Sequence, residues 1–209
     1  MIIGITGPIA SGKSVLAEML VANGFTRLTL SEEVREEARK IGAPIERVSL
    51  QNLGNEMRLK HGKGYWAKRL IAKIEADKHY VIEGIRNPGE IEELIKFRNF
   101  VLVGIIAPIE DRLQWIIARN KDSDPKTIEG VRAIDARDRG FGEGECGQQV
   151  ESCLALANVC ISNNTSLDDL RLKAVQILED IGIKNKQFEK TLFQDQKHDV
   201  PPHTKVCGL

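Results

Sequence analysis

The chain alternates between short apolar runs and longer segments in which apolar residues recur at helical spacing. The apolar runs cover residues 1–6, 27–30, 80–82, 100–106 and 158–162. Their lengths are typical of buried strands, and the run at 100–106, the most continuous, is typical of a central strand covered on both faces. Helical spacing occupies 15–22, 48–60, 65–76 and 167–181, and further segments that begin at Ser31 and Pro88. This alternation predicts an α/β fold, a doubly wound parallel sheet of about five strands with helices on both faces.

The segment between the first apolar run and the first helical segment fits a phosphate-binding pattern. Residues 7–14 read Gly-Pro-Ile-Ala-Ser-Gly-Lys-Ser, which matches GxxxxGK[ST] between a strand and a helix. In that context the unpaired N–H groups of the helix start and the positive end of its dipole face one place. A chance glycine turn, the alternative, leaves the Lys-Ser pair and the two flanking elements unexplained.

This loop predicts ATP and Mg²⁺ as cofactors. Lys13 can reach the β- and γ-phosphates, and the Ser14 hydroxyl can ligate Mg²⁺. The glycines can adopt positive φ and leave room for phosphate oxygens. The predicted nucleotide-binding residues are Gly7, Pro8, Ile9, Ala10, Ser11, Gly12, Lys13, Ser14 and Val15.

Charged residues also follow the second and third strand-like runs, where ligands of such sheets bind. Glu83 ends the run at 80–82, in the place of an acid that holds a Mg²⁺-bound water or braces the loop. Arg35 and Arg86 can clamp a second anionic ligand through planar, bidentate contacts. The alternatives are a strand-end carboxylate paired with a neighbour and two solvated surface arginines.

Residues of about 110–142 are typical of a lid that closes over phosphates. Arg112 and Arg119 lie seven residues apart on nearly one helical face, a polar break follows, and a second charged helix reaches Arg139. Within this lid we expect Arg119 and Arg137 to close over the transferred phosphoryl group. The alternative is a solvated helical hairpin whose charges pair with one another, and the glycine-rich residues 140–145 are a hinge or a loop.

Composition restricts the partners and the domain organisation. The 209 residues suit one domain, predicted at 1–184, followed by a polar tail at 185–209. Thirty basic and thirty acidic residues cancel, so charge gives no reason to expect nucleic acid or an anionic membrane as a partner. The first strand follows directly on Met1 without a charged leader, and we therefore expect a cytoplasmic protein. The pattern leaves monomer and homodimer open.

The cysteines and tail histidines match no metal-binding spacing. Cys146, Cys153, Cys160 and Cys207 form no CxxC pair, and we expect buried, reduced thiols that act as small hydrophobes. His198, His203 and Cys207 fall in the tail with a spacing unlike any zinc motif.

Beyond the loop, the chain resembles the nucleoside-monophosphate-kinase group of phosphate-loop proteins, which includes adenylate kinase and dephospho-CoA kinase. The segment Ser31-Glu32-Glu33-Val34-Arg35 looks like the one whose Ser or Thr and Arg hold the acceptor nucleotide in that group. Glu83-Gly84-Ile85-Arg86 resembles its Asp-Gly-Phe-Pro-Arg segment, shortened by one residue, and Arg137-Asp138 resembles its returning lid motif. The resemblance, over roughly residues 1–182, implies a kinase fold with a helical lid, with Ser31, Arg35, Glu83 and Arg86 on the acceptor side.

The chain is also similar to a prokaryotic set of adenylate-kinase-related proteins and to the kinase-like N-terminal domain of some deoxycytidylate deaminases. The shared segments are Val34-Arg35-Glu36-Glu37-Ala38, Tyr65-Trp66-Ala67-Lys68-Arg69 and Ala157-Asn158 with Ile161-Ser162-Asn163. Two features depart from the kinase pattern. Residues 8–10 are Pro-Ile-Ala rather than glycine-rich, and residues 31–33 lack the Asp of dephospho-CoA kinases. The zinc-deaminase signature is absent from the chain.

The residues and the resemblance together predict a small-molecule kinase. It would transfer the γ-phosphoryl group of ATP to a nucleoside monophosphate or similar phosphorylated acceptor, with Lys13, Arg86, Arg119 and Arg137 in catalytic roles and Ser14 and Glu83 at the metal. Two alternatives remain. One is a nucleotide sensor that regulates a protein partner without turnover, and the other is hydroxyl phosphorylation of the dephospho-CoA-kinase type.

Overall fold

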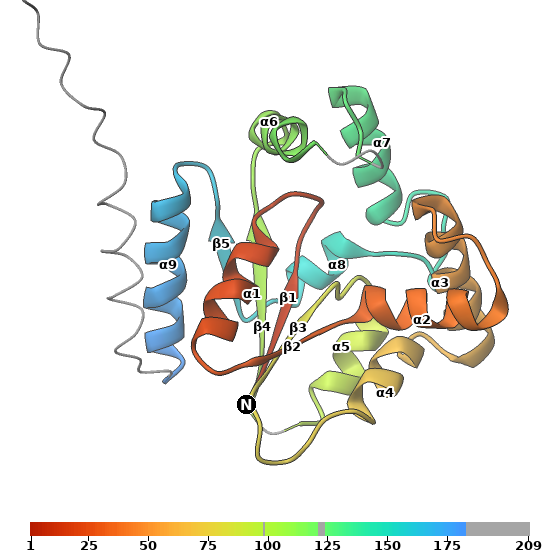
Figure 1. Cartoon of the computed structure of the whole chain (residues 1–209), viewed down its shortest axis with the longest axis horizontal. Helices are drawn as coiled ribbons and strands as arrows, with labels where there is room; N and C mark the ends of the chain where they lie inside the picture. Colours follow the sequence, from red (N-terminus) through yellow and green to blue (C-terminus); the bar gives the residue numbers. More distant parts are fainter. Residues whose placement is uncertain (98, 121–123, 183–209) are drawn as a thin grey trace, which may run out of the picture.

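The computed structural model describes residues 1–97, 99–120 and 124–182. The predicted tail, with Cys207 and both tail histidines, lies outside this range. Five parallel strands form one sheet in the order β2-β3-β1-β4-β5, namely β1 (Ile2–Thr6), β2 (Thr26–Thr29), β3 (Tyr80–Glu83), β4 (Phe100–Ile106) and β5 (Val159–Ser162). The predicted doubly wound α/β architecture is therefore confirmed (Figure 1).

Helices connect the strands and cover both faces of the sheet. Their bounds are α1 (Lys13–Ala22), α2 (Leu30–Ile41), α3 (Arg47–His61), α4 (Tyr65–Ile71), α5 (Pro88–Leu94), α6 (Ile109–Arg119), α7 (Ile128–Asp138), α8 (Val150–Ala155) and α9 (Leu167–Asp180). Among the described residues, no helix combines the length and apolar character that crossing a membrane requires.

Two expectations about the elements need correction. The predicted helix at 65–76 ends at Ile71. The run at 100–106 is an inner strand as predicted, because β4 lies between β1 and β5 and is buried in its middle, although its last residue, Ile106, is exposed. Ser31 does not begin its helix, because α2 starts at Leu30 and the Thr29 hydroxyl caps it by accepting a hydrogen bond from the backbone N–H of Glu32.

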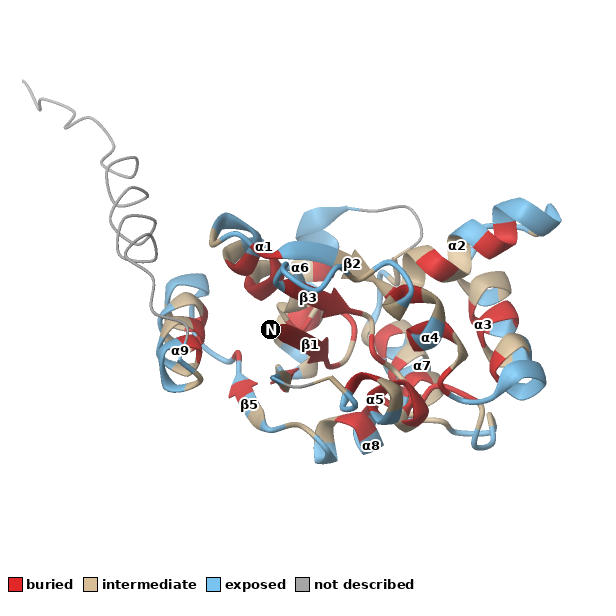
Figure 2. Cartoon of the chain, turned by 90° about the horizontal axis from the view of Figure 1, so that it is seen from below, coloured by how far each residue is buried: buried red, intermediate tan, exposed pale blue. Residues whose placement is uncertain are grey.

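The core consists of two apolar layers, one on each face of the sheet. Because side chains alternate along a strand, Ile3 and Ile5 pack with α1 and α9, while Ile2 packs with the layer of α4 and α5. Trp66 fills this second layer and is completely buried, its indole N–H donating to the carbonyl of Gly54. Figure 2 shows burial concentrated in the inner strands and the helix faces turned toward them.

Helices α6 and α7 lie beyond the carboxyl ends of the strands (Figure 1). A small third apolar cluster of Ile9, Ile116 and Val131 packs both helices against the loop that follows β1. The sheet therefore places the phosphate loop beneath this helical pair, with α2 and α3 beside it.

Candidate functional site

The loop after β1 has the backbone that phosphate binding requires. Gly7 has φ +144°, and a Cβ there would lie 2.1 Å from the carbonyl oxygen of Ile105, so only glycine fits. Gly12, at φ +103°, precedes α1 and supplies no side-chain cap, which leaves the first N–H groups of α1 open to an anion. Ala10 also has a positive φ, of 58°.

Lys13 folds back over this loop. Its Nζ donates to the carbonyl oxygens of Gly7 at 2.8 Å and Pro8 at 2.5 Å. Desolvation by burial lowers the pKa of Lys13 from 10.5 to about 7, and the nearby positive charge of Arg86 acts in the same direction. A bound phosphate would supply the negative charge that the ammonium group lacks here.

Ser14 and Glu83 come together because β3 pairs with β1, with Glu83 opposite Ile5. The Ser14 hydroxyl lies 3.4 Å from Oε2 of Glu83, and Oε1 of the same carboxylate forms an ion pair with Nε of Arg27 at 2.6 Å. A hydroxyl and a carboxylate are hard oxygen donors that fit Mg²⁺ when nucleotide phosphates and water complete its coordination. The two residues expected at the metal therefore have the right chemistry and lie next to each other.

A cavity of about 710 Å³ opens on the phosphate loop, and we call it the loop pocket. Its far walls come from α6, with Trp115 and Arg119, and from the segment after β5, where Asn163 binds the carbonyl of Ser11 through its amide nitrogen. Such a volume and mixed lining suit a nucleotide.

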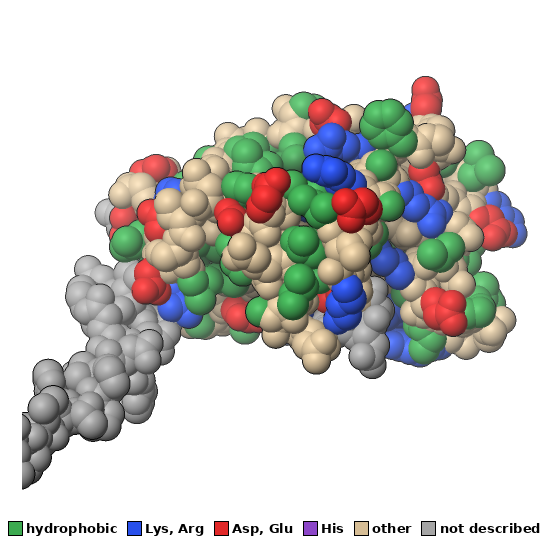
Figure 3. Space-filling model, turned by 90° about the horizontal axis from the view of Figure 1, so that it is seen from above, with side chains coloured by type: hydrophobic (Ala, Val, Ile, Leu, Met, Phe, Trp, Pro, Cys, Tyr) green, Lys and Arg blue, Asp and Glu red, His purple; other side chains and the backbone are tan. Residues whose placement is uncertain are grey.

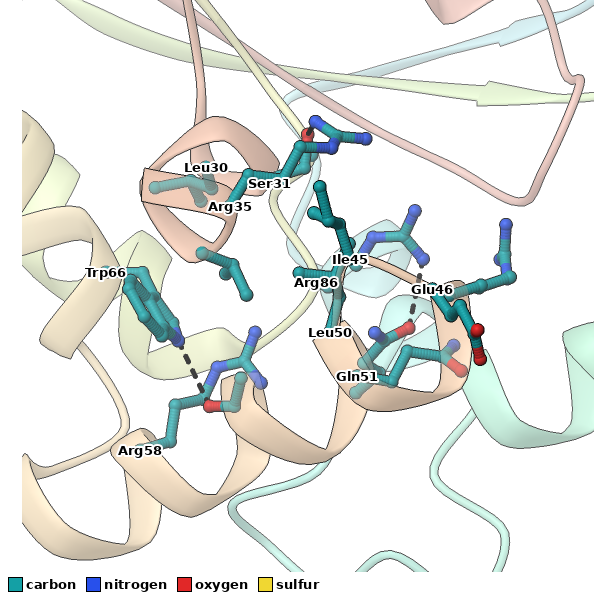
Figure 4. Close-up of a pocket in the computed structure, with 15 residues that line it drawn as sticks. Leu30, Ser31, Arg35, Ile45, Glu46, Leu50, Gln51, Arg58, Trp66 and Arg86 are labelled. Atoms are coloured by element: carbon teal, nitrogen blue, oxygen red, sulfur yellow. Dashed lines mark hydrogen bonds between the residues drawn. The ribbon is translucent and has the colours of Figure 1, made fainter. Parts of the chain in front are cut away.

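A second cavity, of about 240 Å³, lies between α2, α3 and the turn after β3 (Figure 4). We call it the arginine pocket, because its lining includes Arg35, Arg47, Arg58 and Arg86; the other lining residues are Leu30, Ser31, Val34, Ile45, Glu46, Leu50, Gln51, Gly54, Trp66, Gly84 and Gln148. Arg35 and Arg86 line both cavities, so the two pockets meet at these side chains. In the space-filling view of this side of the molecule, Lys and Arg side chains gather near the middle of the face (Figure 3).

Hydrogen bonds and ion pairs hold two arginines of this second pocket, Arg86 and Arg58, in place. Nη1 of Arg86 donates to Asp138 and to Gln148, both at 2.9 Å. Arg58 pairs with Glu90, whose other oxygen accepts from the backbone N–H groups of Arg86 and Asn87. The turn that presents Arg86 is therefore anchored from beneath by a buried ion pair.

The structure brings together most of the residues predicted for the site. Lys13, Ser14, Arg35, Arg86 and Arg119 line the loop pocket, and Val15 also does so. Ser31 lines the arginine pocket, where its hydroxyl accepts from Arg35. Arg119 carries a bidentate contact with Asp124 while still facing the loop pocket.

Two lid arginines have other partners. Arg137 lines neither pocket, because its Nε donates to Glu143 and its Nη2 to Asn52. Arg112 is buried and binds Asp135 through two nitrogens and the carbonyl of Ile9 through one of them. Arg112 thus braces α6 and α7 against the phosphate loop and does not share an open face with Arg119.

Sequence reasoning missed Arg47, Trp115 and Asn163. Trp115 and Asn163 follow the fourth and fifth strands, and the rule that ligands bind beyond strand ends could have selected them. Arg47 offered no such signal, because it begins a helix that does not follow a strand. Burial lowers its pKa from the ordinary arginine value.

The cysteines agree only in part with the expectation of buried thiols. Cys153 is buried, and desolvation raises the pKa of its thiol, but Cys146 is half-buried and Cys160 is exposed. Cys160 lies on β5, an edge strand, and is exposed although its sulfur lies 3.9 Å from the carbonyl oxygen of Leu154. No three His, Cys, Asp or Glu residues of the described part of the chain are grouped as a metal site.

Comparisons with solved structures agree with this architecture. TT1252 from Thermus thermophilus is 24% identical, with a TM-score of 0.52, over 86% of this chain and 97% of the other. Shikimate kinase from Acinetobacter baumannii, solved in complex with shikimate, is 17% identical with a TM-score of 0.50, over 88% and 95%. The fold and the loop therefore define a phosphate-loop protein with the fold of small-molecule kinases.

The sequence relatives are more specific about the family. A UPF0200 protein of Sulfurisphaera tokodaii is 31% identical over 86% of this chain and 97% of its own length. Another from Thermoplasma volcanium is 32% identical over 84% and 95%. The chain belongs to the UPF0200 family. No family model matches it.

Proposed function

We propose that the protein is a small-molecule kinase that transfers the γ-phosphoryl group of ATP to a nucleoside monophosphate or a similar phosphorylated acceptor. One observation carries this proposal. A pocket built on the phosphate loop meets a second, arginine-lined pocket at two shared side chains, Arg35 and Arg86. A donor and an acceptor in these pockets would approach each other at those arginines.

The residues around the junction can position and neutralise phosphates. Lys13 and the amides of the loop would hold the β- and γ-phosphates, while Arg35 and Arg86 would hold the acceptor. An oxygen of the acceptor phosphate attacks the γ-phosphorus, the bond to the β-phosphate oxygen breaks, and ADP leaves. Because that oxygen is already anionic, the reaction needs no strong general base.

The metal has a place in this arrangement. Mg²⁺, when bound with the nucleotide, would neutralise charge on the phosphates, and Ser14 and Glu83 would hold it. Arg119, at the edge of the loop pocket, would shield the nucleotide from water on the α6 side once it leaves Asp124. Arg137 has no part in this proposal, since Glu143 and Asn52 hold its guanidinium group.

The test is an acceptor screen. The purified protein would be incubated with ATP, Mg²⁺ and nucleoside monophosphates, with dephospho-CoA as a hydroxyl acceptor, and ADP and phosphorylated products would be measured. We expect ADP release that depends on a monophosphate and disappears in Lys13→Ala. Arg86→Ala should lose turnover while keeping its affinity for ATP.

Other outcomes would replace the proposal. Phosphorylation of dephospho-CoA alone would indicate a hydroxyl-directed kinase. Tight ATP binding without turnover on any acceptor would indicate a nucleotide sensor that acts through a protein partner.

A further inference from the structure

Arg47, the first residue of α3, has donors that nothing in the described structure uses. Its Nε and Nη2 are buried and have no hydrogen-bond partner among the described residues. The nearest acid oxygen, Oδ2 of Asp138, lies 3.7 Å from Nη2, which is too far for a hydrogen bond. Buried donors of charged groups are costly to leave unsatisfied, so this guanidinium group is prepared for a ligand on the open side of the arginine pocket.

The charges around Arg47 leave a positive excess. Asp138 is shared, because it also accepts from Arg86 at 2.9 Å, and its other oxygen accepts from Gln51. Arg58 is neutralised separately by Glu90. Two arginines therefore face one buried carboxylate, and Glu46, the acid among the residues that line this pocket, is exposed. An anion would balance the remaining charge.

The opposite wall of the pocket is apolar. Leu30 and Val34 of α2 supply it, together with Trp66, whose N–H is already bound to the carbonyl of Gly54. Figure 4 shows Leu30 and Trp66 on one side of the space and Arg86 and Gln51 on the other. A sugar or other polyol would leave its hydroxyl groups unpaired against this wall, whereas a flat heteroaromatic ring would lose little.

We infer that Arg47 and Arg86 together hold the phosphate group of the acceptor, whose planar body lies against the wall of Leu30, Val34 and Trp66. This inference rests on the proposed function and names a residue and a substrate class for the same site. Arg47 acts as an acceptor-binding and specificity-determining residue, and it contacts the acceptor and not ATP, since it lines the arginine pocket alone.

Calorimetry on the full-length protein tests this inference. The loop pocket is first saturated with a non-hydrolysable ATP analogue and Mg²⁺, so that added phosphates cannot bind there. AMP, CMP, GMP and UMP are then titrated, each beside its nucleoside, into the wild type, Arg47→Gln and Arg47→Lys. Arg132→Gln is the matched control, because Arg132 is exposed on α7 and lines neither pocket.

We expect at least one monophosphate to bind the wild type more tightly than its nucleoside. Arg47→Gln should lower the affinity for that monophosphate about 10- to 100-fold, as expected for lost charge-assisted hydrogen bonds. The affinities for the nucleoside and for the ATP analogue should stay within about threefold of the wild type. Arg47→Lys should restore part of the loss, because it keeps the charge without the bidentate geometry. Thermal melting should show Arg47→Gln folded, since it removes donors that had no partner.

Three results would overturn the inference: no monophosphate with an advantage over its nucleoside, an advantage that survives Arg47→Gln, or an equal loss for the ATP analogue. The turnover screen separates this inference from the proposed function. Loss of the monophosphate advantage in Arg47→Gln without any turnover would keep the binding site and reject the kinase. Turnover with an unchanged KM for the acceptor in Arg47→Gln would keep the kinase and reject the role of Arg47.

Discussion

The loop pocket and the arginine pocket are built in different ways. The phosphate-binding side of the first comes from one continuous stretch, residues 7–15, whose backbone does most of the work. The second is assembled from α2, α3, the turn after β3 and Gln148, and side chains carry its charge. Backbone donors remain when side chains change, whereas Arg58 and Arg86 of the second pocket each depend on a particular acidic partner.

The loop pocket and the arginine pocket should therefore be sensitive to different kinds of substitution. In the loop, the contributions that reduce the stability of the fold come from single residues, namely the positive φ of Ala10 and the desolvation of Lys13. In the arginine pocket, the cost of burying charged groups is offset by ion pairs between distant segments, such as Arg58 with Glu90 and Arg86 with Asp138. Substitutions in the loop should therefore act mainly on nucleotide binding, with small effects on stability, and the loss of an ion partner in the arginine pocket should affect the stability of the whole protein.

The largest effect should come from Arg58→Met. This substitution leaves the carboxylate of Glu90 buried without its ion partner, which costs about 3–5 kcal/mol of unfolding free energy. Urea unfolding followed by circular dichroism measures it. Arg39→Met is the control, because Arg39 forms an exposed pair with Glu32 that is worth about 0–1 kcal/mol. Equal losses of unfolding free energy in the two variants would contradict a special role of the buried Arg58–Glu90 pair in stability.

Lys13→Met should have the next largest effect, and its main effect should be on nucleotide binding. Removing a charged donor from the phosphate site should lower the affinity for ATP about 100-fold. Calorimetry with and without Mg²⁺ measures the affinity, with Lys60→Met, an exposed substitution on α3, as the control. A change of less than about threefold would show that ATP does not use this loop as proposed.

Lys13 should also make the stability of the ligand-free protein depend on pH. Its pKa is about 7 in the folded protein and 10.5 ordinarily, so between these values the unfolded chain binds a proton that the folded protein has released. Raising the pH through this range therefore favours folding. We expect the unfolding free energy of the wild type, relative to Lys13→Met, to rise from pH 7 to pH 9 in chelator. A constant difference would mean that Lys13 keeps its ordinary pKa.

The smallest effect concerns Ala10. An alanine at φ 58° is strained, and glycine relieves that strain while adding freedom to the unfolded chain, so Ala10→Gly should change stability by at most about 1 kcal/mol, in the stabilising direction. Ala118→Gly on the exposed face of α6 should destabilise by about 0.5–1 kcal/mol. Parallel thermal melts compare the two, and the same sign in both would contradict the assignment of strain to Ala10.

The parts of the fold that depend on local sequence were predictable. The apolar run at 100–106 coincides with β4, and Gly7 and Gly12 have the positive φ expected of them. Helix ends that depend on capping were predicted less well, because Thr29 rather than Ser31 provides the cap of α2. The run at 100–106 correctly indicated an inner strand, but strand order could not be read from hydrophobicity, so nothing in the sequence indicated that β1 lies at the centre.

In the candidate site, too, the residues that depend on local sequence were predictable, and those that depend on tertiary packing were not. The loop residues follow one motif, and Glu83 and Arg86 follow a strand, so the sequence placed them. Arg47 reaches the pocket through the packing of α3 against α2 and α4, which no local pattern encodes. Helical spacing put Arg112 and Arg119 on one face, but a buried partner, Asp135, determines what Arg112 does.

Two carboxylates of helix α7, one turn apart, form ion pairs with other elements of the fold. Asp135 binds Arg112 of α6, and Asp138 binds Arg86 beyond β3 and Gln51 of α3. Moving this helix away from the phosphate loop would break both ion pairs together, one of which, Arg112–Asp135, is buried. Most of the conformational entropy of Arg86 and Arg112 is then lost when the chain folds and not when a ligand binds. Such preorganisation should favour the affinity of the site for small anions.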